Sequence, residues 1–220
     1  MRSSVKQVLS MVRLLAPLRT VRNWFVKAPQ TISPMEHLKQ YAAKLGIKVI
    51  PSREVIDVCR GKDTIRISTS HEIYTHDMVK YFDYYFRAVS PDLKSDQRIV
   101  DYSYPRLHCL QPSGVELEFP SLPESDETTE VYLKALDLQP GDCMLDLGAY
   151  AGASAYFFSK AVGPDGLVIA FEPDQKTFPY LLGNIKRHQL INVNPVAKGV
   201  WKETTTLRFS SEGNLSLIHI

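Results

Sequence analysis

Two carboxylates and two glycines between residues 143 and 172 have the types and spacing that could bind a nucleotide. Asp146 lies within a short apolar run, and Gly148 and Gly152 follow that run. Glu172 ends the next apolar run along the chain. Glycines let the backbone turn tightly and approach a ligand closely, and an acid at a strand end can accept hydrogen bonds from both hydroxyls of a ribose. The pattern therefore predicts a nucleotide site.

The apolar runs and turns around these residues predict the elements that position them. Residues 143–147 and 167–171 are apolar runs of strand length, and residues 153–162 carry small and apolar side chains at helical spacing. A Gly-Pro-Asp-Gly turn at 163–166 ends the helix. The stretch is thus one βαβ unit, in which the free N–H groups at the start of the helix favour a carboxylate or a phosphate.

The position of Asp146 discriminates between nucleotides. A dinucleotide fingerprint reads Gly-x-Gly-x-x-Gly, whereas this sequence reads Asp-x-Gly-x-x-x-Gly from residue 146. A carboxylate at that point repels a pyrophosphate but suits the ammonium group of an amino acid. Because S-adenosylmethionine carries that ammonium together with a ribose for Glu172, it is the cofactor that the pattern predicts.

The wider stretch, roughly residues 112–210, resembles the FkbM family of S-adenosylmethionine-dependent methyltransferases. The residues that carry the resemblance are Pro140-Gly141-Asp142, Leu145-Asp146-Leu147-Gly148-Ala149, Gly152, Gly166, Ala170-Phe171-Glu172-Pro173, Asn184-Ile185 and Asn192-Val193. The resemblance implies an α/β fold of the Rossmann-like class I methyltransferase type. It also implies methylation of a hydroxyl oxygen on a small-molecule acceptor, a sugar or other glycan, or a polyketide.

Each residue of this stretch has an expected role. Asp146 would orient the methionine ammonium, Glu172 would hold the ribose, and Pro173 would rigidify the chain after Glu172. The turn under the methionine moiety would be formed by Gly148, Ala149, Tyr150 and Gly152. No catalytic base can be named from the sequence. His71 and His76, which lie near Asp77, are five residues apart and would not share a helix face, so no metal site is predicted.

Two other interpretations stay open. An NAD-dependent oxidoreductase or epimerase would use a similar βαβ unit, but the missing middle glycine and the presence of Asp146 argue against it. The other interpretation is an inactive fragment that binds a partner through its helical N-terminal part.

Composition limits the partners and the compartment. The 220 residues have a formal net charge of +2, which gives no case for a nucleic-acid partner. The three cysteines lack metal or redox spacing, which favours a reducing, cytoplasmic setting. Residues 1–28 are basic, with apolar side chains at helical spacing, and predict a helix. This helix would lie on an anionic membrane surface, serve as a transit peptide, or dock on its own domain or on a partner.

The remaining chain divides into an α+β N-terminal region, residues 29–120, and the N-terminal half of a methyltransferase domain, residues 121–210. The expected elements of the first region are a helix over 34–45, strands over 47–50 and 63–68, a helix over 71–89 and a hairpin within 99–120. In the second they are a helix over 129–136, the βαβ unit, a helix over 176–190, a strand over 192–197, and a hairpin or an edge extension formed by 200–201 and 205–209.

The end of the chain predicts a truncated reading frame. Only three core strands of a class I sheet are present. Residues 211–220 are expected to be a non-native or disordered tail, because Ser216 to Ile220 resemble a translated adapter sequence. Strand 143–147 would then present an unpaired apolar edge, for which we expect poor solubility or partial folding.

Overall fold

A computed structural model describes residues 33–94, 96–203, 205, 208–210 and 217–219. The contacts of the chain divide it into two compact units, Met1–His37 and Leu38–Ile220. The predicted basic helix over residues 1–28, and with it the predicted membrane contact, lies outside the described residues. Within the described ranges, no helix combines the length and the hydrophobicity needed to cross a bilayer.

The first helix, α2 (Pro34–Lys44), confirms the helix predicted over residues 34–45. The hydroxyl group of Ser33 accepts a hydrogen bond from the backbone N–H of Glu36, 3.2 Å away. Gly46 follows the helix with a φ of +69°, a left-handed conformation that glycine adopts without steric cost.

A five-stranded sheet in the order β1-β2-β3-β5-β4 follows α2. Its strands are β1 (Lys48–Pro51), β2 (Val55–Arg60), β3 (Asp63–Ser68), β4 (Asp92–Lys94) and β5 (Gln97–Tyr102). All neighbouring strands are antiparallel except β3 and β5, which are parallel. Strand β3 confirms the prediction for residues 63–68, whereas β2 was not predicted.

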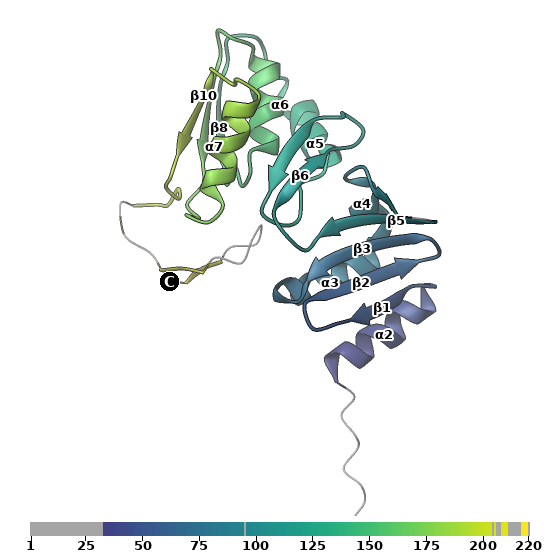
Figure 1. The fold of residues 1–220 in the computed structure, drawn as a ribbon. Helices are drawn as coiled ribbons and strands as arrows, with labels where there is room; N and C mark the ends of the chain where they lie inside the picture. Colours follow the sequence, from purple (N-terminus) through teal and green to yellow (C-terminus); the bar gives the residue numbers. More distant parts are fainter. Residues whose placement is uncertain (1–32, 95, 204, 206–207, 211–216, 220) are drawn as a thin grey trace, which may run out of the picture. The chain divides into compact units, whose positions relative to one another are not determined.

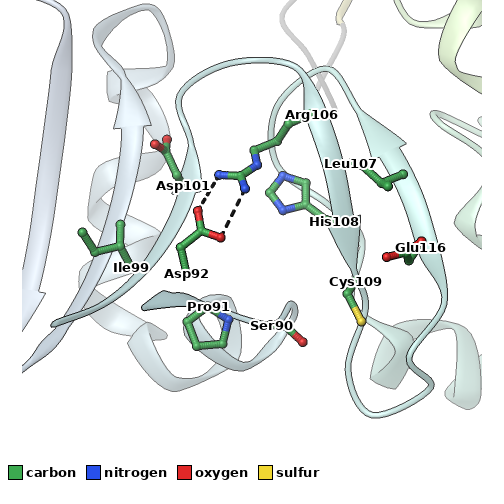
Figure 2. A pocket seen from close by; sticks show the side chains of 10 residues that line it. All are labelled: Ser90, Pro91, Asp92, Ile99, Asp101, Arg106, Leu107, His108, Cys109 and Glu116. Atoms are coloured by element: carbon green, nitrogen blue, oxygen red, sulfur yellow. Dashed lines mark hydrogen bonds and ion pairs between the residues drawn. The ribbon is translucent and has the colours of Figure 1, made fainter. Parts of the chain in front are cut away.

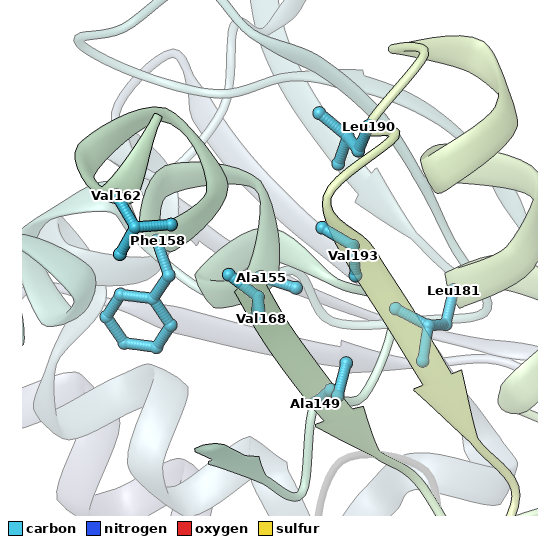
Figure 3. Close-up of a cluster of buried hydrophobic side chains, with 9 residues drawn as sticks. Ala149, Ala155, Phe158, Val162, Val168, Leu181, Leu190 and Val193 are labelled. Atoms are coloured by element: carbon cyan, nitrogen blue, oxygen red, sulfur yellow. The ribbon is translucent and has the colours of Figure 1, made fainter. Parts of the chain in front are cut away.

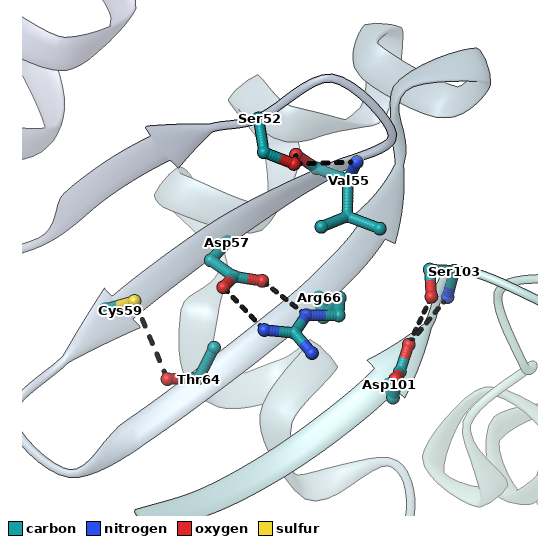
Figure 4. Close-up of polar contacts among 8 residues, drawn as sticks. All are labelled: Ser52, Val55, Asp57, Cys59, Thr64, Arg66, Asp101 and Ser103. Atoms are coloured by element: carbon teal, nitrogen blue, oxygen red, sulfur yellow. Dashed lines mark hydrogen bonds and ion pairs between the residues drawn. The ribbon is translucent and has the colours of Figure 1, made fainter.

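The two faces of this sheet differ sharply in polarity. One face is buried and carries Ile56, Val58, Ile65 and Ile67. On the other face the guanidinium of Arg66 donates two hydrogen bonds to the carboxylate of Asp57, with N···O distances of 2.7 and 2.8 Å (Figure 4). The alternation of apolar and charged side chains along β2 and β3 is typical of a sheet with one face in the core and one in water.

Three short helical segments follow β3, where one helix over residues 71–89 was predicted. They are η3 (Thr69–Tyr74), α3 (Thr75–Lys80) and α4 (Phe82–Arg87). The prediction of a single helix was wrong because the backbone leaves the helical conformation at Tyr81, where φ is −118° and ψ is 43°. The break lets Phe82 and Phe86 stack in the core, with ring centroids 5.7 Å apart. Packing of aromatic side chains thus overrides a continuous helical pattern.

Strands β6 (Arg106–Cys109) and β7 (Glu116–Phe119) form an antiparallel pair, which confirms the predicted hairpin. A buried asparagine of the later helix α7, Asn184, ties this hairpin to the glycine turn. Its side-chain amide donates to the carbonyls of Glu118 and Ala151, at 2.8 Å each, and its oxygen accepts from the N–H of Glu118 at 2.9 Å. The hairpin therefore buttresses the region that follows it.

The second half of the chain has an α/β, Rossmann-like fold (Figure 1). Its elements are α5 (Asp126–Leu136), β8 (Cys143–Leu147), α6 (Ala153–Val162), β9 (Leu167–Phe171), α7 (Phe178–Arg187) and β10 (Val193–Val196). The three strands form a parallel sheet in the order β10-β9-β8. The predicted βαβ unit is confirmed. Helix α5 begins three residues earlier than predicted because Ser125 caps it, accepting a hydrogen bond from the N–H of Glu127.

An apolar core holds α6 and α7 against one face of this parallel sheet (Figure 3). Its buried members are Ala149, Ala155, Phe158, Val162, Val168, Ala170, Leu181, Leu190 and Val193. Leu145 and Leu147 of β8 lie outside this core and are 53% and 58% exposed. Within the described residues β8 is an edge strand, as the sequence predicted.

Two further strands, β11 (Arg208–Ser210) and β12 (Leu217–His219), pair antiparallel with each other. The predicted hairpin or edge extension was wrong in its pairing, because residues 200–201 are not in a strand and β11, which overlaps the predicted strand 205–209, pairs with β12 in a separate sheet.

Candidate functional site

Asp146 projects from the carboxyl-terminal part of β8 and is almost buried, with 8% of its surface exposed. Its Oδ2 accepts a hydrogen bond of 2.8 Å from the hydroxyl of Ser154, the second residue of α6. No hydrogen bond to its Oδ1 comes from the described part of the chain. Burial raises the pKa of Asp146, and the hydrogen bond from Ser154 partly opposes that shift.

The turn between β8 and α6 depends on two left-handed glycines. Gly148 has a φ of +95° and Gly152 a φ of +91°. A Cβ at residue 152 would lie 2.7 Å from Cδ1 of Leu181, whereas one at residue 148 would meet no atom within 4 Å. The left-handed backbone therefore disfavours a side chain at both glycines, and at Gly152 the side chain of Leu181 would also have to move.

The turn is fastened to the end of the neighbouring strand β9. The N–H groups of Gly148 and Ala149 both donate to the carbonyl of Phe171, at 2.9 and 2.8 Å. Residue 172 follows directly, and in the parallel register Leu147 lies opposite Phe171. Because neighbouring parallel strands end at the same edge of a sheet, the carboxylates of Asp146 and Glu172 reach the same turn.

Glu172 is buried, and backbone N–H groups bind both of its oxygens. Oε2 accepts from Tyr150 at 2.9 Å, and Oε1 accepts from Asp174 at 2.7 Å. Burial raises the pKa of Glu172, the two N–H groups oppose this shift, and the charges of Asp174 and Asp146 add to it. A carboxylate oxygen can accept more than one hydrogen bond, so a ribose hydroxyl could still bind at each oxygen.

Tyr150 contributes to the turn through its backbone. Its φ is +47°, a left-handed value that is rare for a residue with a side chain. The ring is buried against Phe119 of the hairpin, with centroids 6.1 Å apart, and the hydroxyl lies 3.2 Å from that of Ser121. Burial raises the pKa of this hydroxyl. The side chain of Tyr150 therefore packs against the hairpin, and only its backbone N–H contacts Glu172.

Pro173, the remaining predicted residue, follows Glu172 and is half-buried. Its ring lies 3.6 Å from the position that a Cβ of Gly199 would occupy. It packs against the segment after β10, which is consistent with the rigid exit predicted for it.

A cavity of about 260 Å³ opens beside Asp146. Strand β8, helices α5 and α6, and the segment before α5 enclose it. The polar residues that line it are Glu124, Thr128, Thr129, Tyr132, Asp146 and Ser154. Gly148 also lines this cavity, so one side of the glycine turn borders it directly. We call this space the α6 cavity.

Sequence reasoning missed two polar residues of the α6 cavity. The sequence assigned no role to Glu124, and Ser154 was counted only as a small helical residue. The Ser154 backbone N–H lies near the carboxyl group of Glu124. Burial, together with the negative charges of Asp146 and Glu172, raises the pKa of Glu124 to about 8, and the Ser154 N–H partly opposes the shift. The sequence feature that could have indicated a role for Ser154 is its position two residues after Gly152, at the start of the predicted helix.

A second cavity, of about 190 Å³, lies between β5 and the β6–β7 hairpin. Figure 2 shows Arg106 there, donating two hydrogen bonds to the carboxylate of Asp92, with the ring of His108 beside it. Burial and the charge of Arg106 lower the pKa of His108 to about 4. No glycine turn or helix start borders this cavity, so it lacks the features predicted for the nucleotide.

The described residues form no metal centre. No group of three or more histidine, cysteine, aspartate or glutamate side chains in these ranges is placed to hold a metal ion. His71 and His76 do not form such a group with Asp77.

Comparison with known proteins gives no family model and no curated protein that matches the chain. Among solved structures, a SAM-dependent methyltransferase from Aquifex aeolicus is 30% identical, covering 32% of this chain and 37% of that one, with a TM-score of 0.30. A SAM-dependent O-methyltransferase from Thermotoga maritima is 15% identical over 55% and 60%, with a TM-score of 0.33. A protein-L-isoaspartate O-methyltransferase is 14% identical over 74% and 42%, with a TM-score of 0.35.

In each of these pairs the chain spans less than two thirds of the solved structure. The fold described above rests on the strand order of the chain itself, and the resemblance to the FkbM family stays an expectation.

Proposed function

We propose that this chain binds S-adenosylmethionine and forms the cofactor-binding part of a methyltransferase. The observation that carries the proposal is the convergence of two buried carboxylates on one glycine turn. Asp146 reaches the start of α6 through Ser154, and Glu172 holds the N–H of Tyr150 in the same turn. The two acids come from adjacent parallel strands, so their spacing is fixed by the sheet.

The residues present fit this cofactor. The free Oδ1 of Asp146 is an acceptor for the ammonium group of the methionine moiety. Each oxygen of Glu172 already binds one backbone N–H and retains a site for a ribose hydroxyl. The absence of a side chain at Gly148 leaves open space at the turn, where a ligand can approach the backbone.

When bound, S-adenosylmethionine would supply a methyl group that its sulfonium makes electrophilic. The share of this chain is then to bind and orient: Asp146 and Ser154 fix the amino-acid end, and Glu172 fixes the ribose. Fixing both ends aligns the methyl group with an acceptor, which is the main contribution a protein makes to a reaction of this kind. We assign no catalytic base.

The acceptor we propose is a hydroxyl group of a small molecule, a sugar or a polyketide. The support for it is the resemblance between residues 112–210 and the FkbM family. Transfer from radiolabelled S-adenosylmethionine to a panel of hydroxylated acceptors tests this class. An ether product survives mild base, whereas a methyl ester is hydrolysed. Base-labile label alone would argue against hydroxyl acceptors.

Isothermal titration calorimetry of the full chain with S-adenosylmethionine, and separately with NAD, tests cofactor binding. We expect binding of the first and none of the second. Glu172→Gln keeps the shape of the side chain but loses the charge, so we expect affinity to fall about tenfold or more. Glu130→Gln is the matched control, because Glu130 lies exposed on α5 and pairs with Lys134.

Circular dichroism confirms that each variant is folded before its affinity is compared. Tighter binding of NAD than of S-adenosylmethionine would contradict the proposal. An unchanged dissociation constant for Glu172→Gln would remove the proposed role of Glu172.

A further inference from the structure

Ser154 lies beside two carboxyl groups. Its hydroxyl donates to Asp146 at 2.8 Å, and its backbone N–H is near the carboxyl group of Glu124 and lowers the pKa of that group. Both acids line the α6 cavity, although they are 22 residues apart and come from different elements. Glu124 directly precedes Ser125, the residue that caps α5. The starts of α5 and α6 thus bring a second acid to the place where Asp146 lies.

The charged groups that line the α6 cavity are all acidic. Within the described residues that line it there are two carboxyl groups and no lysine, arginine or histidine. The titratable groups that face Glu124 are Asp146 of β8, Glu172 beyond β9, Tyr150 of the glycine turn and Tyr132 of α5. All of them are neutral or negative at neutral pH, so none compensates a charge on Glu124.

Two partly buried carboxyl groups so close together resist joint ionisation. The pKa of Glu124 is raised to about 8 by burial and by the charges of Asp146 and Glu172. Glu124 therefore carries a proton in most molecules at pH 7. Asp146, which is 8% exposed, lines the same cavity and accepts a hydrogen bond from Ser154 at Oδ2, while no hydrogen bond from the described residues reaches its Oδ1. An acceptor without a donor and a neighbouring protonated acid together favour a cationic occupant.

We propose that Glu124 is a ligand-binding residue of the α6 cavity, which accepts the ammonium group of the cofactor together with Asp146 and releases its proton as that ammonium enters. The inference rests on the proposed function, because S-adenosylmethionine is the ligand that brings the ammonium. The proton leaves the carboxyl group of Glu124 for the solvent, and the incoming ammonium replaces its positive charge. No bond other than the O–H bond of Glu124 is broken.

The experiment is titration calorimetry of the full chain at pH 7.0 in two buffers with different ionisation enthalpies. The probes are S-adenosylmethionine and S-adenosylhomocysteine, which share the ammonium and the ribose and differ in the sulfonium. The dependence of the measured enthalpy on the buffer gives the number of protons released. A carboxyl group with a pKa of about 8 is about nine-tenths protonated at pH 7, so we expect nearly one proton released for each molecule of either probe.

Glu124→Gln retains a carbonyl oxygen of similar position but has no proton to release. We expect it to bind both probes about tenfold more weakly and to release almost no protons. The exposed variant Glu130→Gln should behave as the wild type. Between pH 6 and pH 7.5 the affinity of the wild type should rise about tenfold for each pH unit, while that of Glu124→Gln should stay nearly constant.

The possible outcomes separate this inference from the proposed function. Binding of S-adenosylmethionine without proton release, or with equal release in Glu124→Gln, overturns the inference and leaves the proposed function standing. Release with S-adenosylmethionine but not with S-adenosylhomocysteine overturns the assignment to the ammonium, because the sulfonium would then be responsible. No binding of either probe by the folded wild type overturns both.

Discussion

The two main sheets of this protein follow different rules on their outer faces. In the sheet β1–β5, the face away from the core carries the ion pair of Asp57 with Arg66, whereas Asp63 and Arg98 pair on the same face as the buried Ile65. In the sheet β8–β10, the corresponding face of β8 carries Leu145 and Leu147, both more than half exposed. Asp57 and Arg66 pair with each other in the middle of their strands, whereas Asp146 and Glu172 lie near strand ends.

The difference separates a sheet whose exposed charges pair with each other from a sheet that holds the carboxylates of the proposed cofactor site. Opposite charges that pair with each other leave little net charge to attract a cationic ligand. Asp146 and Glu172 are instead held by neutral N–H and hydroxyl donors, which keep their carboxyl groups in place without cancelling their charge. The apolar outer face of β8 is typical of parallel sheets that are covered on both sides.

The largest expected contrast between the sheets is in the cost of shortening an apolar side chain. Ile65 of β3 is 0% exposed, so we expect Ile65→Ala to lower the free energy of unfolding by about 2–5 kcal/mol. Leu145→Ala on β8 should cost less than about 1 kcal/mol. Urea unfolding followed by circular dichroism measures both. Equal losses would mean that Leu145 is covered in solution.

A smaller contrast is expected in the dependence of stability on pH. The pKa of His108 is lowered to about 4, so the unfolded chain binds the extra proton and stability falls as pH drops from about 6.5 towards 4. The pKa of Glu124 is raised to about 8, so the folded chain holds the proton and stability falls as pH rises from about 4.5 towards 8. Each slope approaches about 1.4 kcal/mol per pH unit between the two pKa values of its group.

Urea unfolding at a series of pH values tests both slopes. His108→Phe keeps a ring between Tyr102 and Phe119, whose centroids lie 5.4 and 6.2 Å from that of His108, and should flatten only the acid side of the profile. Glu124→Gln should flatten only the alkaline side. Profiles of the variants that superpose on that of the wild type would show that these two groups do not titrate as their burial implies.

The smallest expected effect on stability, within about 0.5 kcal/mol, is that of Leu147→Lys at the edge strand β8. The change should nevertheless reduce self-association, because a charge on an exposed apolar edge opposes pairing with another chain. Leu93→Lys on β4, the three-residue edge strand of the other sheet, is the control and should change little. Sedimentation velocity measures both. A larger effect of Leu93→Lys would reverse the comparison.

The sequence was sufficient to predict the βαβ unit because its signals are local. Apolar runs, the glycines at 148 and 152 and the turn at 163–166 each act within a few residues. The bounds of β8 and β9 agree with the predicted strands for that reason. By contrast, β2 was missed, because Asp57 and Arg60 interrupt its apolar pattern and their partners, Arg66 and Asp83, lie elsewhere in the chain.

The candidate site was predictable only in part. Asp146 and Glu172 could be placed because both end strands of a recognisable unit. Glu124 could not, since its role depends on the approach of the segment before α5 to the start of α6, which is a tertiary contact. Tyr150 was predicted to lie under the methionine moiety, and the sequence did not show that its ring packs against Phe119 and its hydroxyl approaches Ser121.

The side chain of Asn184 makes the glycine turn and the β6–β7 hairpin mechanically dependent on each other. Its amide is bonded to the carbonyl of Ala151 inside the turn and to both backbone groups of Glu118 in the hairpin. A rearrangement of the turn must therefore either break bonds to the hairpin or carry it along. Slow exchange of the Glu118 amide proton would report the closed state of the turn from a position outside it.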